Sequence, residues 1–203
     1  MVVQNNRYTP GIRAMRQVVE AGELGAPGYA VLIHHKARGG PYPTTRNMHL
    51  WQQGNHQLDS LVYVLGEKAL RARGCMVAPE WEDWPSAGGC SAVIEFARGL
   101  TGTYFASSNA RANDLQFRVE CEHGAILYRN GAVSVVRNRV ETPLELEPKF
   151  EPSIEDLLAR QFHEYVLNDV EPPTSGRRNL HIIGLIQAIE RSAETGMAVE
   201  VPR

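Results

Sequence analysis

The sequence lacks the features that mark several large classes of proteins. No stretch of its 203 residues approaches the roughly 20 consecutive apolar residues that a membrane-spanning helix needs. The opening segment MVVQNNRYTP lacks the basic-then-apolar order of a signal peptide. The formal net charge is -2, so there is no excess of Lys and Arg to bind a nucleic acid backbone or an anionic membrane. We therefore expect a cytoplasmic protein that binds neither nucleic acid nor membranes.

Cysteine is also scarce, since Cys75, Cys90 and Cys121 are the only three. They are widely spaced and include no C-x-x-C, which argues against a disulfide framework and a structural zinc site. No G-x-S-x-G marks a nucleophilic serine. No G-x-G-x-x-G follows a predicted strand, because GELGAPG has the wrong spacing and follows a helix. We therefore expect neither cofactor-binding residues nor metal ligands in this chain.

The remaining composition is that of an ordinary soluble protein, with 43% hydrophobic and 22% charged residues. A chain of this length can bury one core of moderate size, so we expect residues 1–203 to form a single domain. Thr9 and Pro10 predict the start of a first helix, which Gly22 ends. The run YAVLIHHK predicts a strand, and the irregular segment ARGGPYPTTRNM after it predicts a surface loop.

Residues 55–65 predict a second helix that ends at Gly66. From about residue 69 to residue 140 the pattern changes to short strands joined by Arg-Gly, His-Gly and Asn-Gly turns. Joints this short make neighbouring strands antiparallel. A third helix is predicted after Ser153 and a last one from about Leu180, followed by a short strand in MAVEV.

Helices at both ends of an antiparallel strand block predict an α+β fold, an open and mostly antiparallel sheet with helices on one face. The other face is then available for oligomerisation. If apolar or aromatic side chains such as Tyr104, Phe117 and Tyr128 point outward there, a second copy would cover them. We therefore expect a homodimer or homotetramer that assembles through the sheet face.

The helix over 55–65 has two chemically distinct faces. At about 100° per residue, the side chains opposite its apolar stripe are those of His56, Asp59, Ser60 and Tyr63. One interpretation is a solvated face on which His56 and Asp59 form an i, i+3 pair. The other is an active site, because His49, Trp51 and Gln52 crowd the same end and an imidazole titrates at about pH 6.5. The pattern alone leaves both interpretations open.

Four segments resemble the carboxy-terminal domain of the Gfo/Idh/MocA oxidoreductases. In chain order they are VVQNNRYTPGIRAMRQVVEAGELGAP, GNHQLDSLVYVLG, EHGAILY and SAETGMAVEV. The most specific of these signals is the G-x-H-x-x-D formed by Gly54, His56 and Asp59 at the start of a helix. The resemblance implies an open, mostly antiparallel sheet that binds substrate on its helix side and packs subunits together on the other.

The resemblance also implies a chemistry. In that family a separate amino-terminal Rossmann domain holds NAD or NADP, and hydride passes between the nicotinamide and a hydroxyl-bearing carbon, often of a sugar, cyclitol or diol. His56 matches the family's proton-handling histidine, so it is the expected catalytic residue. The substrate-binding residues that we expect around it are Arg7, Trp51, Gln52, Asp59, His49 and Arg46.

The sequence departs from the family pattern at several points. Gln52 stands where the family usually has an acid, and a glutamine can hydrogen-bond a hydroxyl but cannot carry a charge. Met48 and His49 replace the usual paired glycines, which favours a different substrate or mechanism. The Rossmann domain is missing from this chain, so NAD or NADP would bind only if that domain is supplied elsewhere. The alternative function is a non-catalytic, oligomeric ligand-binding or structural domain derived from such an enzyme.

A basic cluster precedes the second helix. Its members are His34, His35, Lys36, Arg38, Arg46 and His49. This cluster is either a solvated loop or a cationic surface for a carboxylate or phosphate, in which case an acidic sugar or an aromatic acid is the better substrate. His49, His56 and Asp59 are possible metal ligands, but their spacing matches no motif with a physical basis.

Overall fold

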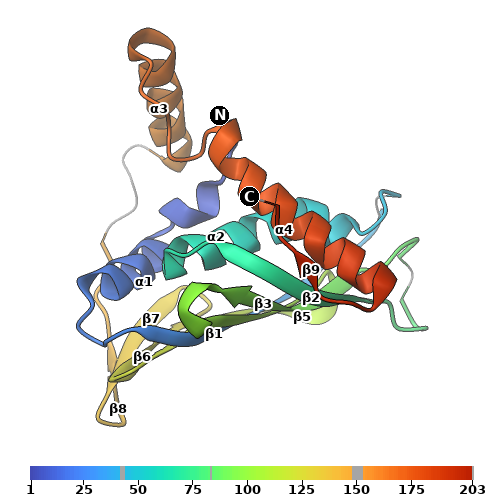
Figure 1. Ribbon diagram of the computed structural model, residues 1–203, viewed down its shortest axis with the longest axis horizontal. Coiled ribbons are helices and arrows are strands. Elements are labelled where there is room, and N and C mark those ends of the chain that lie inside the picture. Colours follow the sequence, from blue (N-terminus) through green and yellow to red (C-terminus); the bar gives the residue numbers. More distant parts are fainter. Residues whose placement is uncertain (42–43, 83, 148–152, 203) are drawn as a thin grey trace.

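The computed structural model describes residues 1–41, 44–82, 84–147 and 153–202. The strands of this described part form one open sheet of nine strands, in the order β8-β7-β6-β5-β1-β4-β3-β2-β9. Figure 1 shows that α1, α2 and α4 lie over the same face of this sheet. The fold is therefore α+β, open and mostly antiparallel, as the sequence predicts.

The strands follow the predicted meander, with one exception in the centre. They are β1 (Pro27–Ala37), β2 (Ala69–Val77), β3 (Gly89–Phe96), β4 (Thr101–Ser107), β5 (Asn109–Cys121), β6 (Gly124–Arg129), β7 (Ala132–Arg137), β8 (Val140–Pro143) and β9 (Val199–Glu200). Among the described strands, β1 and β4 make the one parallel pair. The predicted turns Arg98-Gly99 and Asn130-Gly131 join β3 to β4 and β6 to β7, with positive φ at each residue.

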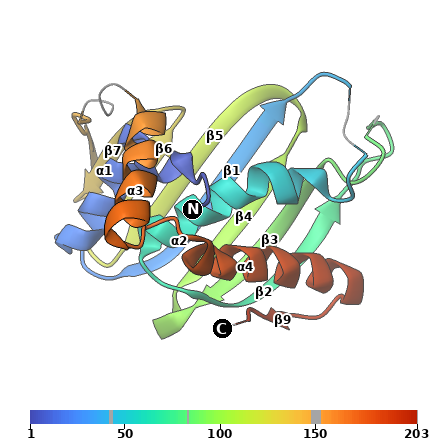
Figure 2. The same cartoon turned by 90° about the horizontal axis from the view of Figure 1, so that it is seen from above.

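Four α-helices and three shorter helical segments complete the described fold. They are α1 (Pro10–Ala21), α2 (Asn55–Leu65), α3 (Ile154–Asn168), α4 (Gly176–Thr195), the 3-10 helices η1 (Asn5–Tyr8) and η3 (Ala97–Gly99), and the π-helix η2 (His49–Gly54). Seen from above in Figure 2, α2 and α4 lie side by side across the sheet, and the amino terminus lies over α2. In Figure 1, α3 projects away from the sheet. None of the described helices is long and apolar enough to cross a membrane.

Serine side chains set the starts of the last two helices. Ser153 Oγ accepts a hydrogen bond from the backbone N–H of Asp156, as the predicted cap requires. Ser175 Oγ does the same for Arg178, and α4 therefore begins at Gly176, one turn before the predicted start. Thr9 occupies the N-cap position of α1, but its hydroxyl donates to the carbonyl oxygen of Asn6 instead.

The predicted second helix is longer than its sequence pattern indicates, because η2 continues directly into α2. Gly54 joins the two and has ordinary helical angles, φ -59° and ψ -33°. A Cβ at this position would lie 3.3 Å from the hydroxyl oxygen of Tyr104 and 3.2 Å from Leu50 Cδ1, closer than most such contacts, so glycine suits the packing here. This glycine therefore lets the helix approach the sheet closely.

The expectation that Tyr104, Phe117 and Tyr128 point to the outer face of the sheet is wrong. The strand register places them in one row with Leu32, and side chains in such a row share a face of the sheet. That face lies under the helices, so Tyr104 and Phe117 are buried and Tyr128 is half-buried. The outer face instead carries the exposed side chains of Tyr29 and Val93.

Candidate active site

The polar face of α2 is covered by other parts of the protein rather than solvated. Leu58 and Leu61 are buried in the core, as the apolar stripe predicts. Asp59 and Ser60, from the polar stripe, are nevertheless only 1% and 3% exposed. η1 and α1 both pack against α2 and account for this burial. The interpretation of this face as a solvated helix surface is therefore wrong.

Arg7 of η1 forms a bidentate salt bridge with Asp59. Its Nε donates to Asp59 Oδ2 at 2.9 Å, and its Nη2 donates to Asp59 Oδ1. Burial raises the pKa of the Asp59 carboxyl, and the guanidinium opposes that shift. The guanidinium also lies 5.1 Å from the ring centre of Tyr63 and donates to the carbonyl oxygen of Pro173. Arg7 thus fastens η1 to α2 and neutralises the buried carboxylate.

His56 lies one helical turn before Asp59 and is half-buried. Its Nδ1 is buried and has no hydrogen-bond partner among the described residues. Burial lowers the pKa of His56 below its usual value, and the charge of Asp59 opposes this only in part. The imidazole is therefore neutral at pH 7, the form that accepts a proton.

A buried hydrogen-bond chain runs beneath α2. The Tyr104 hydroxyl donates to Gln57 Oε1 at 2.5 Å, and Gln57 Nε2 then donates to His34 Nδ1. Because Nδ1 accepts, the proton of the neutral His34 ring resides on Nε2. Burial lowers the pKa of His34, and the neighbouring charges of Lys36 and His35 lower it further. The chain thus fixes both the orientation and the tautomer of His34.

His49 lies inside the core. Its Nδ1 is 2.6 Å from Ser108 Oγ, while its Nε2 is buried without a partner in the described part of the chain. Burial lowers its pKa to about 3, and electrostatic interactions with His34 and Lys36 add to this effect. Its ring centre is 6.3 Å from that of His34. His49 is therefore a neutral residue packed behind His34.

Trp51 and Arg46, two of the other predicted site residues, make their contacts with α4. Trp51 Nε1 points to Glu190 on α4, with the two atoms 3.5 Å apart. Arg46 forms an exposed ion pair at 2.7 Å with Glu194, on the same helix. Gln52 is exposed at the start of the long helix. The structure thus brings together His56, Asp59 and Arg7, and it places Trp51 and Arg46 against α4.

The predicted basic cluster does not form a single cationic surface. Lys36 Nζ donates to Gln53 Oε1 at 3.2 Å on the helix side of the sheet. His35 points to the opposite side, with its ring 5.4 Å from that of Phe105, because neighbouring strand residues alternate. Arg38 lies over Trp84, with 6.0 Å between its guanidinium carbon and the ring centre.

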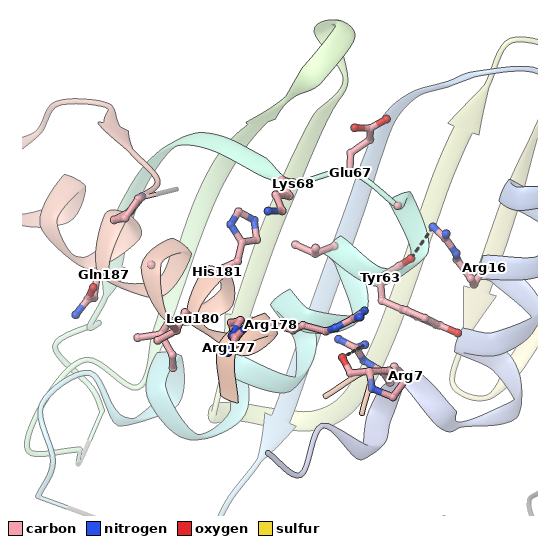
Figure 3. Close-up of a pocket in the computed structure, with 16 residues that line it drawn as sticks. Arg7, Arg16, Tyr63, Glu67, Lys68, Arg177, Arg178, Leu180, His181 and Gln187 are labelled. Carbon is pink, nitrogen blue, oxygen red and sulfur yellow. Dashed lines mark hydrogen bonds between the residues drawn. The ribbon is translucent and has the colours of Figure 1, made fainter. Parts of the chain in front are cut away.

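A groove of about 880 Å³ adjoins this site on the other side of Arg7. It lies between the carboxyl end of α2 and the amino-terminal half of α4, and we refer to it as the α2–α4 groove. Figure 3 shows Arg7, Tyr63 and Arg178 at one end of it, with Lys68 and His181 further along. The residues that line it do not include His56.

The sequence matches the family described as GFO/IDH/MocA C-terminal domain over residues 12–127, more than half of the chain. The chain belongs to this family. The matched region contains α2 with His56 and Asp59, so the G-x-H-x-x-D of this domain lies within the family match. No curated protein sequence is significantly similar to this chain.

Solved oxidoreductases share the fold of this GFO/IDH/MocA domain. An oxidoreductase from Agrobacterium radiobacter, in complex with NAD+, L-tartaric acid and magnesium, has a TM-score of 0.84 and 20% identity over 99% of this chain and 64% of its own. The aldose-aldose oxidoreductase from Caulobacter crescentus, complexed with glycerol, gives 0.86 and 19% over 98% and 63%. Levoglucosan dehydrogenase in complex with NADH gives 0.85 and 17% over 100% and 66%. This chain therefore spans less than two thirds of the first two proteins.

Two residues of the buried hydrogen-bond chain, Gln57 and Tyr104, were not predicted as site residues from the sequence. Gln57 occupies a buried position of α2, on the side of the helix that also carries Leu61. A polar residue within an apolar stripe is the signal that could have revealed it, because buried polar groups need partners. The sequence placed Tyr104 in a strand and gave no sign of a polar role. Its hydroxyl donates to Gln57, which lies 47 residues earlier in the sequence.

Proposed function

We propose that this chain is the substrate-binding and oligomerisation domain of an NAD(P)-dependent oxidoreductase that acts on a hydroxyl-bearing carbon. The observation that carries the proposal is the neutral, half-buried His56 beside the buried Asp59, in a chain of this family. A sugar, cyclitol, diol or acid derivative is the proposed substrate class. The glycerol and L-tartaric acid bound to proteins of the same fold support hydroxyl-bearing ligands.

In this proposal His56 handles the proton. Oxidation of an alcohol removes a hydride from carbon and a proton from oxygen, and the neutral imidazole accepts that proton. Because Nδ1 is buried, Nε2 is the atom that would meet the substrate hydroxyl. Asp59 stabilises the imidazolium that forms, while Arg7 holds Asp59 in place. Gln52, which is exposed at the same end of the helix, can hydrogen-bond a second hydroxyl.

The described residues do not fit a dinucleotide. A dinucleotide site needs a glycine-rich turn from the carboxyl end of a parallel strand into a helix. In the parallel pair, β4 is followed directly by strand β5, and the next described element after β1 is the π-helix η2, so neither strand turns directly into an α-helix. We therefore place the nicotinamide cofactor, which accepts the hydride, in a separate nucleotide-binding domain.

The outer face of the sheet is the proposed oligomer interface. Tyr29 and Val93 are 53% and 47% exposed there, and each would be buried against a second copy. We expect light scattering at micromolar concentration to give a dimer or tetramer, and Val93→Glu to shift it toward the monomer. A wild-type monomer under those conditions would contradict this part of the proposal.

The function is tested first on the chain alone. We expect NADH to cause no saturable quenching of its three tryptophans, and tight binding would contradict the placement of the cofactor elsewhere. Polyols, sugars and hydroxy acids are then added while the His56 imidazole signals are followed by NMR. A responding compound is expected to reduce NAD(P)+ once a nucleotide-binding domain is supplied.

His56→Asn then tests the chemistry. We expect it to lower kcat by roughly 10²–10⁴-fold while compound binding persists, since general bases contribute about that much. His163→Asn, on the exposed surface of α3, is the matched control and should leave kcat unchanged. Binding without turnover by the wild-type protein would favour the non-catalytic alternative.

A further inference from the structure

The α2–α4 groove has an unusual charge for this chain. The formal net charge of the protein is -2, yet the lining of the groove contains six basic residues and one acidic residue, Glu67. The basic residues are Arg7, Arg16, Lys68, Arg177, Arg178 and His181. In Figure 3 the Glu67 carboxylate points away from Lys68 and His181. It instead pairs with Arg98, which does not line the groove.

Three of the guanidinium groups already have acidic partners. Asp59 pairs with Arg7, Glu20 pairs with Arg16, and Glu171 lies 3.6 Å from Arg178. Lys68 and Arg177 have no ion pair or side-chain hydrogen bond within the part of the chain that the structure describes. Both are exposed. The charge of Arg177 helps to lower the pKa of the Glu171 carboxyl, but neither Lys68 nor Arg177 has a direct partner among the described residues, so both can contact a ligand.

His181 adds a neutral donor to the same wall. Its Nε2 accepts the backbone N–H of Ala69 at 3.0 Å, which leaves the ring proton on Nδ1. Burial lowers the pKa of His181, and the charge of Lys68 lowers it further, so the ring stays neutral at pH 7. The groove thus offers one hydrogen-bond donor of fixed tautomer next to a free ammonium group.

The amino terminus of α4 lies at the same place. Gly176 is its first residue, and Arg177 and Arg178 follow in its first turn. Ser175 caps the N–H of Arg178, so unpaired N–H groups and the positive end of the helix dipole remain. This field adds to the charges of Lys68 and Arg177 and favours an anion over a neutral ligand.

Most of the remaining lining is apolar. Val62, Ile183 and Pro202 are among the residues that form it, and Leu180 is 67% exposed. A free inorganic ion would leave this surface in water, whereas a ligand with a carbon skeleton would cover it. The volume of about 880 Å³ is within the range of pockets for small organic molecules.

From these observations we propose that the α2–α4 groove binds a small organic phosphate monoester, at a site separate from His56. A phosphate monoester carries a charge near -2 at pH 7, which matches the two free cations. Its oxygens accept from Lys68, Arg177 and His181, and its carbon skeleton lies on Val62 and Ile183. The proposal does not depend on the oxidoreductase function, because no residue of the proton-transfer step is needed for it.

The test uses the full chain with ribose 5-phosphate as the probe, and ribose and inorganic phosphate as comparisons. We expect saturable binding of ribose 5-phosphate by calorimetry, at least about tenfold tighter than that of either comparison compound. Binding should weaken as salt is added, because the attraction is electrostatic. Absence of saturable binding, or equal affinity for ribose, would overturn the proposal.

Variants and chemical shifts locate the site. Lys68→Gln with Arg177→Gln should weaken ribose 5-phosphate binding by about tenfold or more. The matched control is Arg73→Gln with Arg139→Gln, two exposed arginines outside the groove, which should bind like the wild type. On the wild-type protein, ribose 5-phosphate should shift the amide signals of residues 68–69 and 176–178. Shifts centred on His56 instead, or equal loss in both double variants, would refute the site.

Discussion

The side-chain amide of Gln57 connects Tyr104 on the sheet to His34 on the neighbouring strand, accepting from the first and donating to the second. Because Gln57 Oε1 accepts from Tyr104, its Nε2 group faces His34 and donates to Nδ1. The orientation of the amide and the tautomer of His34 are therefore set together. His34 consequently presents an N–H rather than a lone pair at Nε2, beside Lys36 on the helix side of the sheet.

Replacing this amide should change the protonation of His34. In Gln57→Glu, a buried carboxylate lies next to His34 Nδ1 and favours the imidazolium. We expect the pKa of His34 to rise from its lowered value, as followed by NMR of the ring carbon-bound protons. Gln187→Glu, on the exposed side of α4, is the control and should leave the titration of His34 unchanged. An unchanged His34 in Gln57→Glu would contradict the hydrogen-bond chain.

The ion pair of Arg7 with Asp59 should contribute strongly to stability. Because Asp59 is 1% exposed, Arg7→Met leaves a buried carboxylate without its partner, at a cost of about 3–5 kcal/mol in the free energy of unfolding. Denaturant unfolding measures this change. Arg7→Met combined with Asp59→Leu should recover most of the loss, since both charges are then removed. Arg118→Met, which breaks an exposed pair with Glu120, should change the stability little.

His56 should titrate below its ordinary pKa. Burial lowers the pKa of this group, while Asp59 raises it. NMR titration of the chain is therefore expected to give a midpoint below 6.5 for His56 and a still lower one in Asp59→Asn. In the proposed oxidoreductase, kcat/KM for oxidation of its alcohol substrate should rise with pH through the same midpoint. A midpoint above 7 would mean that His56 is mostly charged at neutral pH, which would contradict its role as the base.

The burial of His49 predicts a loss of stability in mild acid. Its pKa is about 3 in the folded protein and about 6.5 when unfolded, so between these values the unfolded state binds the extra proton. The free energy of unfolding should therefore fall as pH decreases below 6.5, with His49 contributing up to about 1.4 kcal/mol per pH unit. His49→Gln should flatten this slope between pH 5 and pH 6.5, as measured by urea unfolding. His163→Gln, on the exposed surface of α3, should leave the slope unchanged.

Local patterns in the sequence predicted most of the elements. The capping serine of α3, the apolar stripe of α2 and the Asn130-Gly131 turn are each determined by a few adjacent residues, and the structure confirms them. The start of α4 was misplaced because the apolar periodicity begins after the polar first turn. Ser175 was the better indicator of that start.

Long-range relationships were beyond the sequence patterns. The ion pair between Arg7 and Asp59 spans 52 residues, and Trp51 reaches Glu190 over 139. The spacing of polar residues along α2 shows that two faces exist. It cannot show that η1 covers one of them, because that depends on where another segment packs. The same limit explains why the sequence left a single cationic surface open as one of two possibilities, although the side chains of the basic cluster point in different directions.

The position of β1 has a consequence for how this chain folds. Strands β2 to β4 and β5 to β8 can each assemble from neighbours in sequence, whereas β1 must pair with β4 and β5 from roughly 70 to 95 residues away. Closing such long loops costs entropy before contacts compensate for it, so docking of the first strand is expected to limit the rate of folding. Before β1 docks, no backbone hydrogen bonds join the two groups of strands. A mutation that destabilises β1 would therefore leave both groups with unpaired edge strands, to which other molecules can pair.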